Sequence, residues 1–488
     1  MTLCRWFVAA MLAVVPAASH ADDSVLTYHN SNLRRGAYVV HKLTLANAAN
    51  VKRDTDFAPS ISGHVYAQPL FWKPKGAKRG LVIVATESNS VYALDERTGA
   101  TVWQQQLTAS VPLSQLPCGN IDPMGITGTP VIDPIAKVLY LDADTATANG
   151  PRHLVYALSL ADGSVVHGWP IDMQAAITGK GGAFDDSVGE RSALLFFNNK
   201  LYVSYGGMAG DCGGYHGTVA QIAPDSASLD AYWQTRARGG GIWAQGGIAG
   251  DGQALYITTG NTFGASDWSD GEGIIKLLPG LAHSTRKKDY FAPADWKTLD
   301  GSDADLGGTE ALPLNIVNGD GKVHRVIALG KDGNAYLTDR RNLGGIGGQI
   351  QTLSVSSGGI RTAPAVYETK SGTMVAFQSS RGGSCSSSNI TMLNVAISGS
   401  SPMSVAWCAP FSGGGAPIVT TTDGASNPIV WVVGAEGDNK LHGFNALTGQ
   451  AVYSGTDTMT GLHHFQTLIA TPKRFYVAAD NTVYAFTF

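Results

Sequence analysis

One phrase recurs along this chain and constrains its fold more than any other feature. It reads VYALDERTGATVW up to Trp103, VYALSLADGSVVHGW up to Trp169 and LHGFNALTGQAVY up to Tyr453. Each copy is an alternating apolar segment, a turn with a central glycine, and a short strand closed by an aromatic residue. Repetition of one strand–turn–strand unit is typical of the blades of a β-propeller.

Eight segments fit this phrase, and their number predicts the number of blades. Four short strands per blade are compatible with the spacing of the segments, which is about 40 to 65 residues. The segment near Gly273 is the weakest match, and without it the ring would have seven blades. The segments begin near Val91, Val155, Thr218, Gly273, Ala335, Ile390, Leu441 and Thr482.

The two ends of the chain predict how the ring closes. The last phrase, TVYAFTF, stops at Phe488 without a following outer strand. The segment 42–57 has no inner strands before it, so we expect it to supply the missing outer strand and leave no open sheet edge. The sequence therefore predicts an all-β fold over one domain, 22–488: an eight-bladed β-propeller of four-stranded antiparallel blades, closed by the N-terminal segment.

Residues 1–21 have the pattern of a cleaved signal peptide. Arg5 gives the positive start, an apolar run follows over 6–15, and Ser19-His20-Ala21 is a small-x-small cleavage site. The apolar run is too short to span a bilayer, so no membrane span is expected. A periplasmic or secreted protein is predicted.

Cysteine usage and net charge narrow the classes of partner. Four cysteines follow the predicted cleavage site, and an even number in an exported protein suggests two disulfides. The absence of a CxxC or CxxCH motif argues against a zinc ribbon and a covalently attached haem. A net charge of −4 gives no electrostatic case for nucleic acid.

The phrase A-x-D-x-x-T-G-x-x-x-W at 93–103 resembles the tryptophan-docking repeat of the quinoprotein propellers. That group includes the pyrroloquinoline quinone (PQQ) alcohol dehydrogenases and cofactor-free relatives such as outer-membrane assembly scaffolds. The resemblance extends over essentially the whole chain after the signal peptide. It implies a structural role for Trp103 and Trp169, which recur at the repeat position.

Four further matches to the alcohol dehydrogenases occur in order between 205 and 340. The resemblance implies that Trp243, in GGGIWAQGG, stacks under the quinone, and that Asn261, in LYITTGN, binds calcium. In SDADLGG it makes Asp303 the catalytic base and Asp305 a metal ligand, and in GKDGNAYLTDR it places Lys331 at the quinone carbonyls. An aromatic floor, a hard cation with oxygen ligands and a carboxylate base suit quinone chemistry.

The segment GDCGGYHGTV both extends this set and departs from the family. His216 is expected to donate to the quinone and Asp211 to bind the metal. Family members usually carry a glutamate ligand where Cys212 stands or adjoins, and the adjacent cysteine pair common over the cofactor is absent. With Cys118 in the corresponding region, a Cys118–Cys212 disulfide near the mouth of the site is expected.

Other candidate groups have plainer interpretations. Cys385 and Cys408 bracket a hairpin-sized stretch and are expected to form a local disulfide. The charge pair Glu190–Arg191 is interpreted as a solvated loop pair. His463–His464 is a possible metal-binding pair, but no further ligand stands at suitable spacing.

The sequence supports two hypotheses of function. The first is an exported PQQ-dependent oxidoreductase that oxidises an alcohol or sugar hydroxyl, with calcium bound and with a separate electron acceptor. The second is a non-catalytic propeller that serves as a scaffold for a protein or a glycan. A closed pocket over Trp243 would favour the first, and a wide patch with an open central channel would favour the second. The sequence leaves open whether the protein is a monomer or an oligomer of unknown size.

Overall fold

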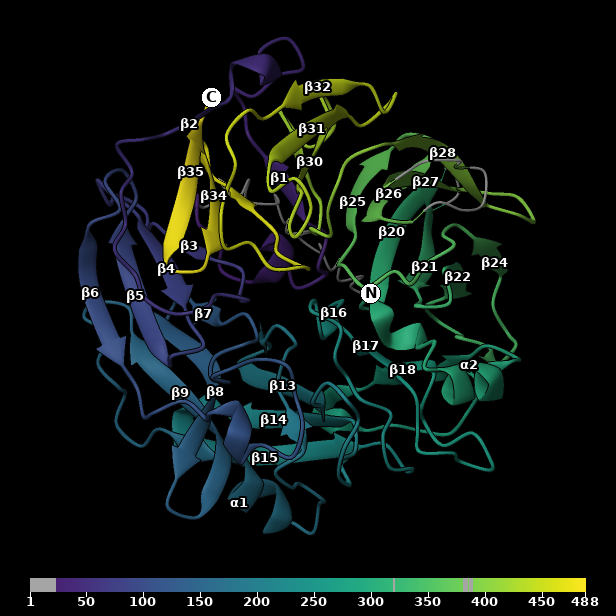
Figure 1. The fold of residues 1–488 in the computed structure, drawn as a ribbon. Helices are drawn as coiled ribbons and strands as arrows, with labels where there is room; N and C mark the ends of the chain where they lie inside the picture. Colours follow the sequence, from purple (N-terminus) through teal and green to yellow (C-terminus); the bar gives the residue numbers. More distant parts are fainter. Residues whose placement is uncertain (1–22, 319–320, 381–384, 386–388) are drawn as a thin grey trace, which may run out of the picture.

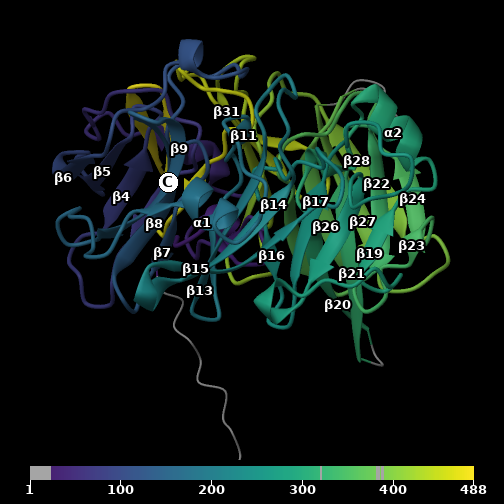
Figure 2. The ribbon, with the colours of Figure 1, turned by 90° about the horizontal axis from the view of Figure 1, so that it is seen from below.

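The computed structural model describes residues 23–318, 321–380, 385 and 389–488. The predicted signal peptide, 1–21, lies outside the described residues. Eight β-sheets are arranged in a ring about one axis, in chain order (Figure 1). Two short α-helices accompany them, α1 (Met173–Thr178) and α2 (Trp296–Ser302), and Figure 2 shows α2 at one face of the ring seen edge-on. The prediction of an eight-bladed, nearly all-β propeller is confirmed.

Each blade contains four antiparallel strands, and the first strand lies nearest the axis (Figure 1). In the first four blades the third and fourth strands are joined by the turn of the repeat phrase or by a longer loop. The strands of these blades are β3 (Leu70–Trp72), β4 (Leu81–Ala85), β5 (Ser90–Asp95), β6 (Thr101–Gln106); β7 (Val131–Asp133), β8 (Val138–Thr147), β9 (Gly150–Ser159), β10 (Ile171–Asp172); β12 (Leu195–Phe197), β13 (Lys200–Gly207), β14 (Thr218–Ala223), β15 (Ser228–Gln234); and β16 (Ala249–Gly250), β17 (Leu255–Thr259), β18 (Gly273–Leu277), β19 (Tyr290–Ala292).

Two short strands add to this half of the ring: β11 (Val188–Gly189) pairs with β13, and β23 (Gly345–Ile346) pairs in parallel with β19. The strands of the other four blades are β20 (Leu312–Asn318), β21 (Gly321–Leu329), β22 (Asn334–Asp339), β24 (Gln351–Ser354); β25 (Ala365–Thr369), β26 (Gly372–Gln378), β27 (Ile390–Ala396), β28 (Met403–Ala409); β29 (Ile418–Thr421), β30 (Ile429–Val433), β31 (Leu441–Asn445), β32 (Ala451–Ser454); and β33 (Ile469–Ala470), β34 (Arg474–Ala479), β35 (Thr482–Thr487) with β2 (Lys52–Arg53).

The recurring phrase marks the third strand of every blade. The eight predicted starting points fall on β5, β9, β14, β18, β22, β27, β31 and β35. The weak match at Gly273 is a true blade strand, because β18 pairs with β17 on one side and β19 on the other. The alternative of a seven-bladed ring is therefore excluded.

The aromatic residue that closes the phrase docks on the next blade. The Trp103 indole N–H donates to the Leu160 carbonyl at 3.1 Å, and that of Trp407 donates to the Ala446 carbonyl at 2.8 Å. Gly163, at φ +76°, lies against the indole ring of Trp103, and a Cβ there would come within 2.6 Å of that ring. The central glycine thus leaves room for the preceding blade's tryptophan as well as allowing the turn.

The N-terminal segment closes the ring as predicted. Within the predicted segment 42–57, β2 pairs with β35 in antiparallel register, with Lys52 opposite Thr487 and Arg53 opposite Phe486. Arg474 reinforces the joint through an ion pair of 2.7 Å with Asp54. The last blade is therefore built from both ends of the chain.

The N-terminal segment also fills the central channel of the ring, which the sequence did not predict. The strand β1 (Ala37–Val39) pairs in parallel with β29 of the seventh blade. Just before it, the buried Arg34 donates to the carbonyls of Ala193, Leu194 and Ile248 at 2.9–3.3 Å, and to the Thr27 hydroxyl. Burial lowers the pKa of Arg34 to about 10, so the guanidinium is charged at neutral pH. The channel is therefore filled by the protein's own chain.

Two disulfides form as predicted, Cys118–Cys212 and Cys385–Cys408. Within the described residues, no helix combines the length and apolarity needed to cross a membrane. Disulfides are typical of proteins outside the reducing cytosol, in agreement with an exported protein.

Replacing Arg34 by Met should destabilise the protein by about 3–5 kcal/mol, the usual loss when one partner of a buried charged network is removed. Its carbonyl partners and the nearby Glu310 carboxylate would lose a buried cation. The change is measured by urea unfolding. The matched control is Arg341→Met, since Arg341 is 71% exposed and its pair with Asp339 should be worth less than about 1 kcal/mol. Equal unfolding midpoints for the two variants would contradict the channel-closing role.

Candidate functional site

The predicted site residues meet in one cavity of about 240 Å³, on the face of the ring that carries α2. They lie either in the connection between the second and third strands of a blade, or in the connection to the next blade. In an antiparallel blade both kinds of connection end on the same face, which is why residues far apart in the sequence meet. Six of the seven predicted residues line the cavity: Asp211, Trp243, Asn261, Asp303, Asp305 and Lys331.

The seventh, His216, does not line this cavity. Its ring Nδ1 faces the Thr235 carbonyl at 2.8 Å, and its backbone forms a bridge with Gly239. The histidine therefore contacts the loop that leads out of the third blade.

Asp305 is the centre of the cavity's hydrogen bonds. Its buried carboxylate accepts from the Trp243 indole N–H at 3.1 Å, the Asn261 backbone N–H at 2.9 Å and the Lys331 ammonium at 3.1 Å. The Asp305 carbonyl also accepts from the Lys331 backbone N–H at 2.8 Å. One carboxylate thus fixes the positions of an aromatic ring, a cation and a loop from three different connections.

Lys331 and Asp303 form the exposed side of the site. Asp303 ends α2 in the left-handed conformation at φ 52°, and its side chain is 66% exposed. The Lys331 ammonium contacts the Asp303 carboxylate and lies 5.6 Å from the centre of the Trp243 ring. Burial lowers the pKa of Lys331, but Asp305 and Asp303 more than offset this and raise it.

Glu272 is a buried acid that the sequence analysis missed. One of its oxygens accepts from the Leu306 backbone N–H at 2.7 Å, and the other has no hydrogen-bond partner among the described residues. Burial, and then the neighbouring Asp305, raise the pKa of Glu272 to about 9. Glu272 directly precedes the repeat phrase at Gly273, but its proximity to Asp305 depends on how two blades pack and has no local sequence signal.

Two arginines, Arg191 and Arg361, complete the wall of the cavity. The prediction for the pair that contains Arg191 was wrong. Glu190–Arg191 was expected to be a solvated pair, yet Glu190 is 2% exposed and accepts from the Gly128 backbone N–H at 3.0 Å. The pair is carried inwards because it directly follows β11. Arg191 lies over the Phe465 ring at 4.7 Å, and its Nε is buried without a hydrogen-bond partner among the described residues. Arg361 also lines the cavity.

The Cys118–Cys212 disulfide lies beside the cavity. Cys212 follows Asp211, and a Cβ on the cavity-lining Gly210 would come within 3.6 Å of Cys118. The bond joins the connection between the first two blades to the loop of the third blade. It therefore constrains one wall of the site. This agrees with the prediction of a disulfide near the mouth of the site.

The residues present fit an anionic aromatic ligand better than a calcium ion. Arg191 and Arg361 have no ion pair among the described residues, and Trp243 offers an indole ring beside Lys331. Calcium prefers six to eight oxygen ligands. Here the Asp305 oxygens already accept from Trp243, Asn261 and Lys331, and Lys331 also pairs with Asp303. The single ammonium thus pairs with both carboxylates that were predicted to act as base and metal ligand, and it offsets only part of their negative charge.

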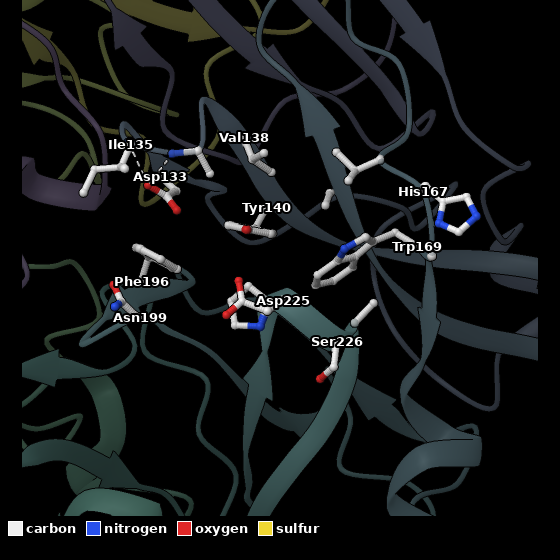
Figure 3. Close-up of a pocket in the computed structure, with 16 residues that line it drawn as sticks. Asp133, Ile135, Val138, Tyr140, His167, Trp169, Phe196, Asn199, Asp225 and Ser226 are labelled. Carbon is white, nitrogen blue, oxygen red and sulfur yellow. Dashed lines mark hydrogen bonds between the residues drawn. The ribbon is translucent and has the colours of Figure 1, made fainter.

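A second, larger cavity of about 740 Å³ lies between the second and third blades. Figure 3 shows Tyr140 between Phe196 and Trp169, with Asp225 facing the same space. The Tyr140 ring lies 5.7 Å from Phe196 and 5.4 Å from Trp169, measured between ring centres. This cavity combines aromatic walls with carboxylates and is separate from the predicted site.

Comparisons with known proteins agree with this fold. A PQQ-type family model, described as outer membrane protein assembly factor BamB, matches residues 76–276. The sequence matches no curated protein.

Several solved structures share the fold at low sequence identity. Quinohemoprotein alcohol dehydrogenase from Comamonas testosteroni is 15% identical, with a TM-score of 0.67 over 95% of this chain and 80% of that one. A europium-containing methanol dehydrogenase is 14% identical, with a TM-score of 0.64 over 94% and 90%. BamB from Moraxella catarrhalis is 14% identical, with a TM-score of 0.54 over 90% and 100%. The family resemblance stated from the sequence is confirmed, and the matches include both dehydrogenases and BamB.

The raised pKa of Glu272 predicts a pH dependence of stability. A carboxyl group whose pKa rises from 4.5 to about 9 on folding contributes stability that is fully present below pH 4.5. This contribution is lost as the pH rises towards about 9. In Glu272→Gln, urea unfolding midpoints measured between pH 5 and pH 8, a window of about three pH units, should therefore fall less steeply than in the wild type.

Asp95→Asn is the matched control, because the Asp95 pKa is shifted in the opposite direction. Burial would raise it, but hydrogen bonds from Arg79, Arg97 and Thr98 lower it to about 2. Asp95 is then ionised in both the folded and unfolded states above about pH 5, so its variant should lose stability without a change in slope. A wild-type slope in Glu272→Gln would show that Glu272 is ionised in the folded protein.

Proposed function

We propose that this chain, which has the fold and repeat of the PQQ-type β-propellers, is an exported oxidoreductase that holds a quinone cofactor in the Trp243 cavity. Its substrate would be a small alcohol or a sugar hydroxyl, and a separate acceptor would take the electrons. The observation that carries the proposal is the pairing of the Trp243 ring with Arg191, Lys331 and Arg361 in one small cavity. PQQ is planar, aromatic and multiply anionic, so it requires these two kinds of group together.

The cavity, of about 240 Å³, is open to solvent on the side of Asp303, and its other walls are held in place by the rest of the chain. The N-terminal segment fills the channel through Arg34, and the Cys118–Cys212 disulfide constrains one wall. The wide open channel expected of a scaffold is not present in the described part of the chain.

A bound quinone would supply the acceptor for the hydride that leaves the alcohol carbon. The protein's part is to orient the groups and to move one proton. Asp303, exposed at the cavity, is positioned to take the hydroxyl proton through its carboxylate oxygen. Lys331 holds that carboxylate in place, and Asp305 holds Lys331 and the Trp243 indole. No step is assigned to calcium, because the carboxylate of Asp305, one of its predicted ligands, already accepts from Trp243, Asn261 and Lys331.

A second candidate function is suggested by the cavity between the second and third blades. Its aromatic residues Tyr140, Trp169 and Phe196 stand beside Asp133 and Asp225 (Figure 3), a combination suited to the apolar faces and hydroxyl groups of a saccharide. A glycan-binding scaffold would bind through this cavity, and Trp169→Ala would abolish its binding.

Isothermal titration of the purified chain with PQQ tests the proposed function. We expect saturable binding of one molecule per chain that weakens by about tenfold or more in Trp243→Ala and in Arg361→Gln. The loss has two causes, removal of the stacking surface in the first variant and of a cation in the second. Because the contact with Arg361 is ionic, binding should also weaken at high salt.

Two matched variants separate the possible outcomes. Trp169 lines the other cavity, so the Trp169→Ala variant should bind PQQ like the wild type. Asp303→Asn should retain binding but lose substrate-dependent reduction of an artificial acceptor. Absence of saturable binding by the wild type, or equal weakening in Trp169→Ala and Trp243→Ala, would rule out the proposed site.

A further inference from the structure

Outside the cavity, three potential metal ligands that are far apart in the sequence meet at one point. His64 precedes the first blade, while His463 and Asp480 belong to the last. The His64 Nδ1 lies 2.7 Å from one Asp480 oxygen, and the His463 Nε2 lies 2.8 Å from the other. One ligand atom from each residue lies within 4.8 Å of the other two, and no other group of three occurs among the described residues. Of the predicted pair His463–His464, only His463 belongs to this group, and the fold brings His64 and Asp480 to it.

These distances are compatible with a transition-metal ion. Around a tetrahedral zinc ion, bonds of about 2.0–2.2 Å to nitrogen and oxygen place two ligand atoms about 3.3 Å apart. The two nitrogen–oxygen separations, 2.7 and 2.8 Å, lie below this value, and all three ligand atoms lie within 4.8 Å of one another. Small side-chain rotations would let an ion replace the two hydrogen bonds.

The surrounding contacts hold these side chains in place. The Val65 backbone N–H donates to Asp480 at 3.0 Å, and the Tyr66 ring stacks on His463 with 4.3 Å between ring centres. The other ring nitrogen of His463 faces Glu436 at 3.9 Å, where a carboxylate can orient a ligating imidazole through a water. Of the three ligands, His64 is the most exposed, with 47% of its side chain accessible, so an ion has a path from solvent.

The cluster lies where the ring closes. The Gly63 backbone N–H donates to the Asn481 side chain at 2.9 Å, and the Asn481 backbone N–H donates to the Gly63 carbonyl at 3.0 Å. An ion held by His64 on one side and by His463 and Asp480 on the other would cross-link the first and last blades. His464, next to His463, lines the Trp243 cavity, so this joint also adjoins the candidate active site.

We propose that His64, His463 and Asp480 form a binding site for a divalent transition-metal ion, of which Zn²⁺ is the example tested, and that the ion fastens the joint between the first and last blades. Two nitrogens and one carboxylate oxygen are ligands that zinc and its neighbours prefer. Three protein ligands leave a coordination position for water, as the exposure of His64 allows. The site does not depend on the quinone proposal, since it shares none of the residues assigned to quinone binding.

The test uses the mature chain without a histidine tag, freed of metal by a chelator and titrated with ZnCl₂ by calorimetry. We expect one Zn²⁺ per chain and a higher Tm with the metal bound, because the ion binds only the folded joint. His64→Ala and His463→Ala should each weaken binding by about tenfold or more and remove the rise in Tm. His64 is largely exposed, so its variant should fold normally.

His442→Ala is the matched control. His442 makes the same kind of contact with Asp438, at 2.9 Å, but no third ligand joins that pair among the described residues. This variant should bind Zn²⁺ and gain in Tm like the wild type. Cobalt absorption in the visible range checks for nitrogen ligands without relying on stability. Absence of saturable Zn²⁺ binding by the wild type, or equal binding by the His64, His463 and His442 variants, would overturn the proposal.

Discussion

The pairing of the two ends of the chain is the constraint on which the rest of this structure depends. The last blade lacks its outer strand until the N-terminal segment joins it, and here β2 completes it against β35. The same segment passes through the channel, where Arg34 binds the carbonyls of the third and fourth blades. Closure therefore fixes the outer joint and the inner channel at once. The loops of the α2 face are held around the axis as a consequence.

The cavity on that face concentrates charge in a small volume. Asp305 is buried, yet it is tolerated because it accepts from Trp243, Asn261 and Lys331. Glu272 lies beside it, and its burial, followed by the proximity of Asp305, raises the pKa of Glu272. Lys331 offsets part of this negative charge. The arrangement resembles neither an ordinary core, which would be apolar, nor a solvated loop, and perturbed acids in a cavity are typical of functional sites.

Repeated elements and short motifs were predictable from the sequence, whereas contacts between distant segments were not. The phrase that contains Trp103 and Gly163 located all eight third strands, since each copy carries its own turn and docking residue. The motifs also identified six of the cavity's residues. Burial of Glu190 and Glu272 was not predictable, because an acidic residue at a loop has the same local pattern whether it points outwards or inwards. The meeting of His64 with Asp480 likewise arises only from ring closure.

A crystal structure of the protein grown with PQQ would locate the ligand independently of any variant. We expect planar density against the Trp243 ring, with ligand carboxylates near Arg191 or Arg361 and with Asp303 left facing the remaining space. Density in the cavity of Tyr140 and Trp169 would instead rule out the quinone site and favour the scaffold function. So would an empty Trp243 cavity at a PQQ concentration that saturates the protein in solution.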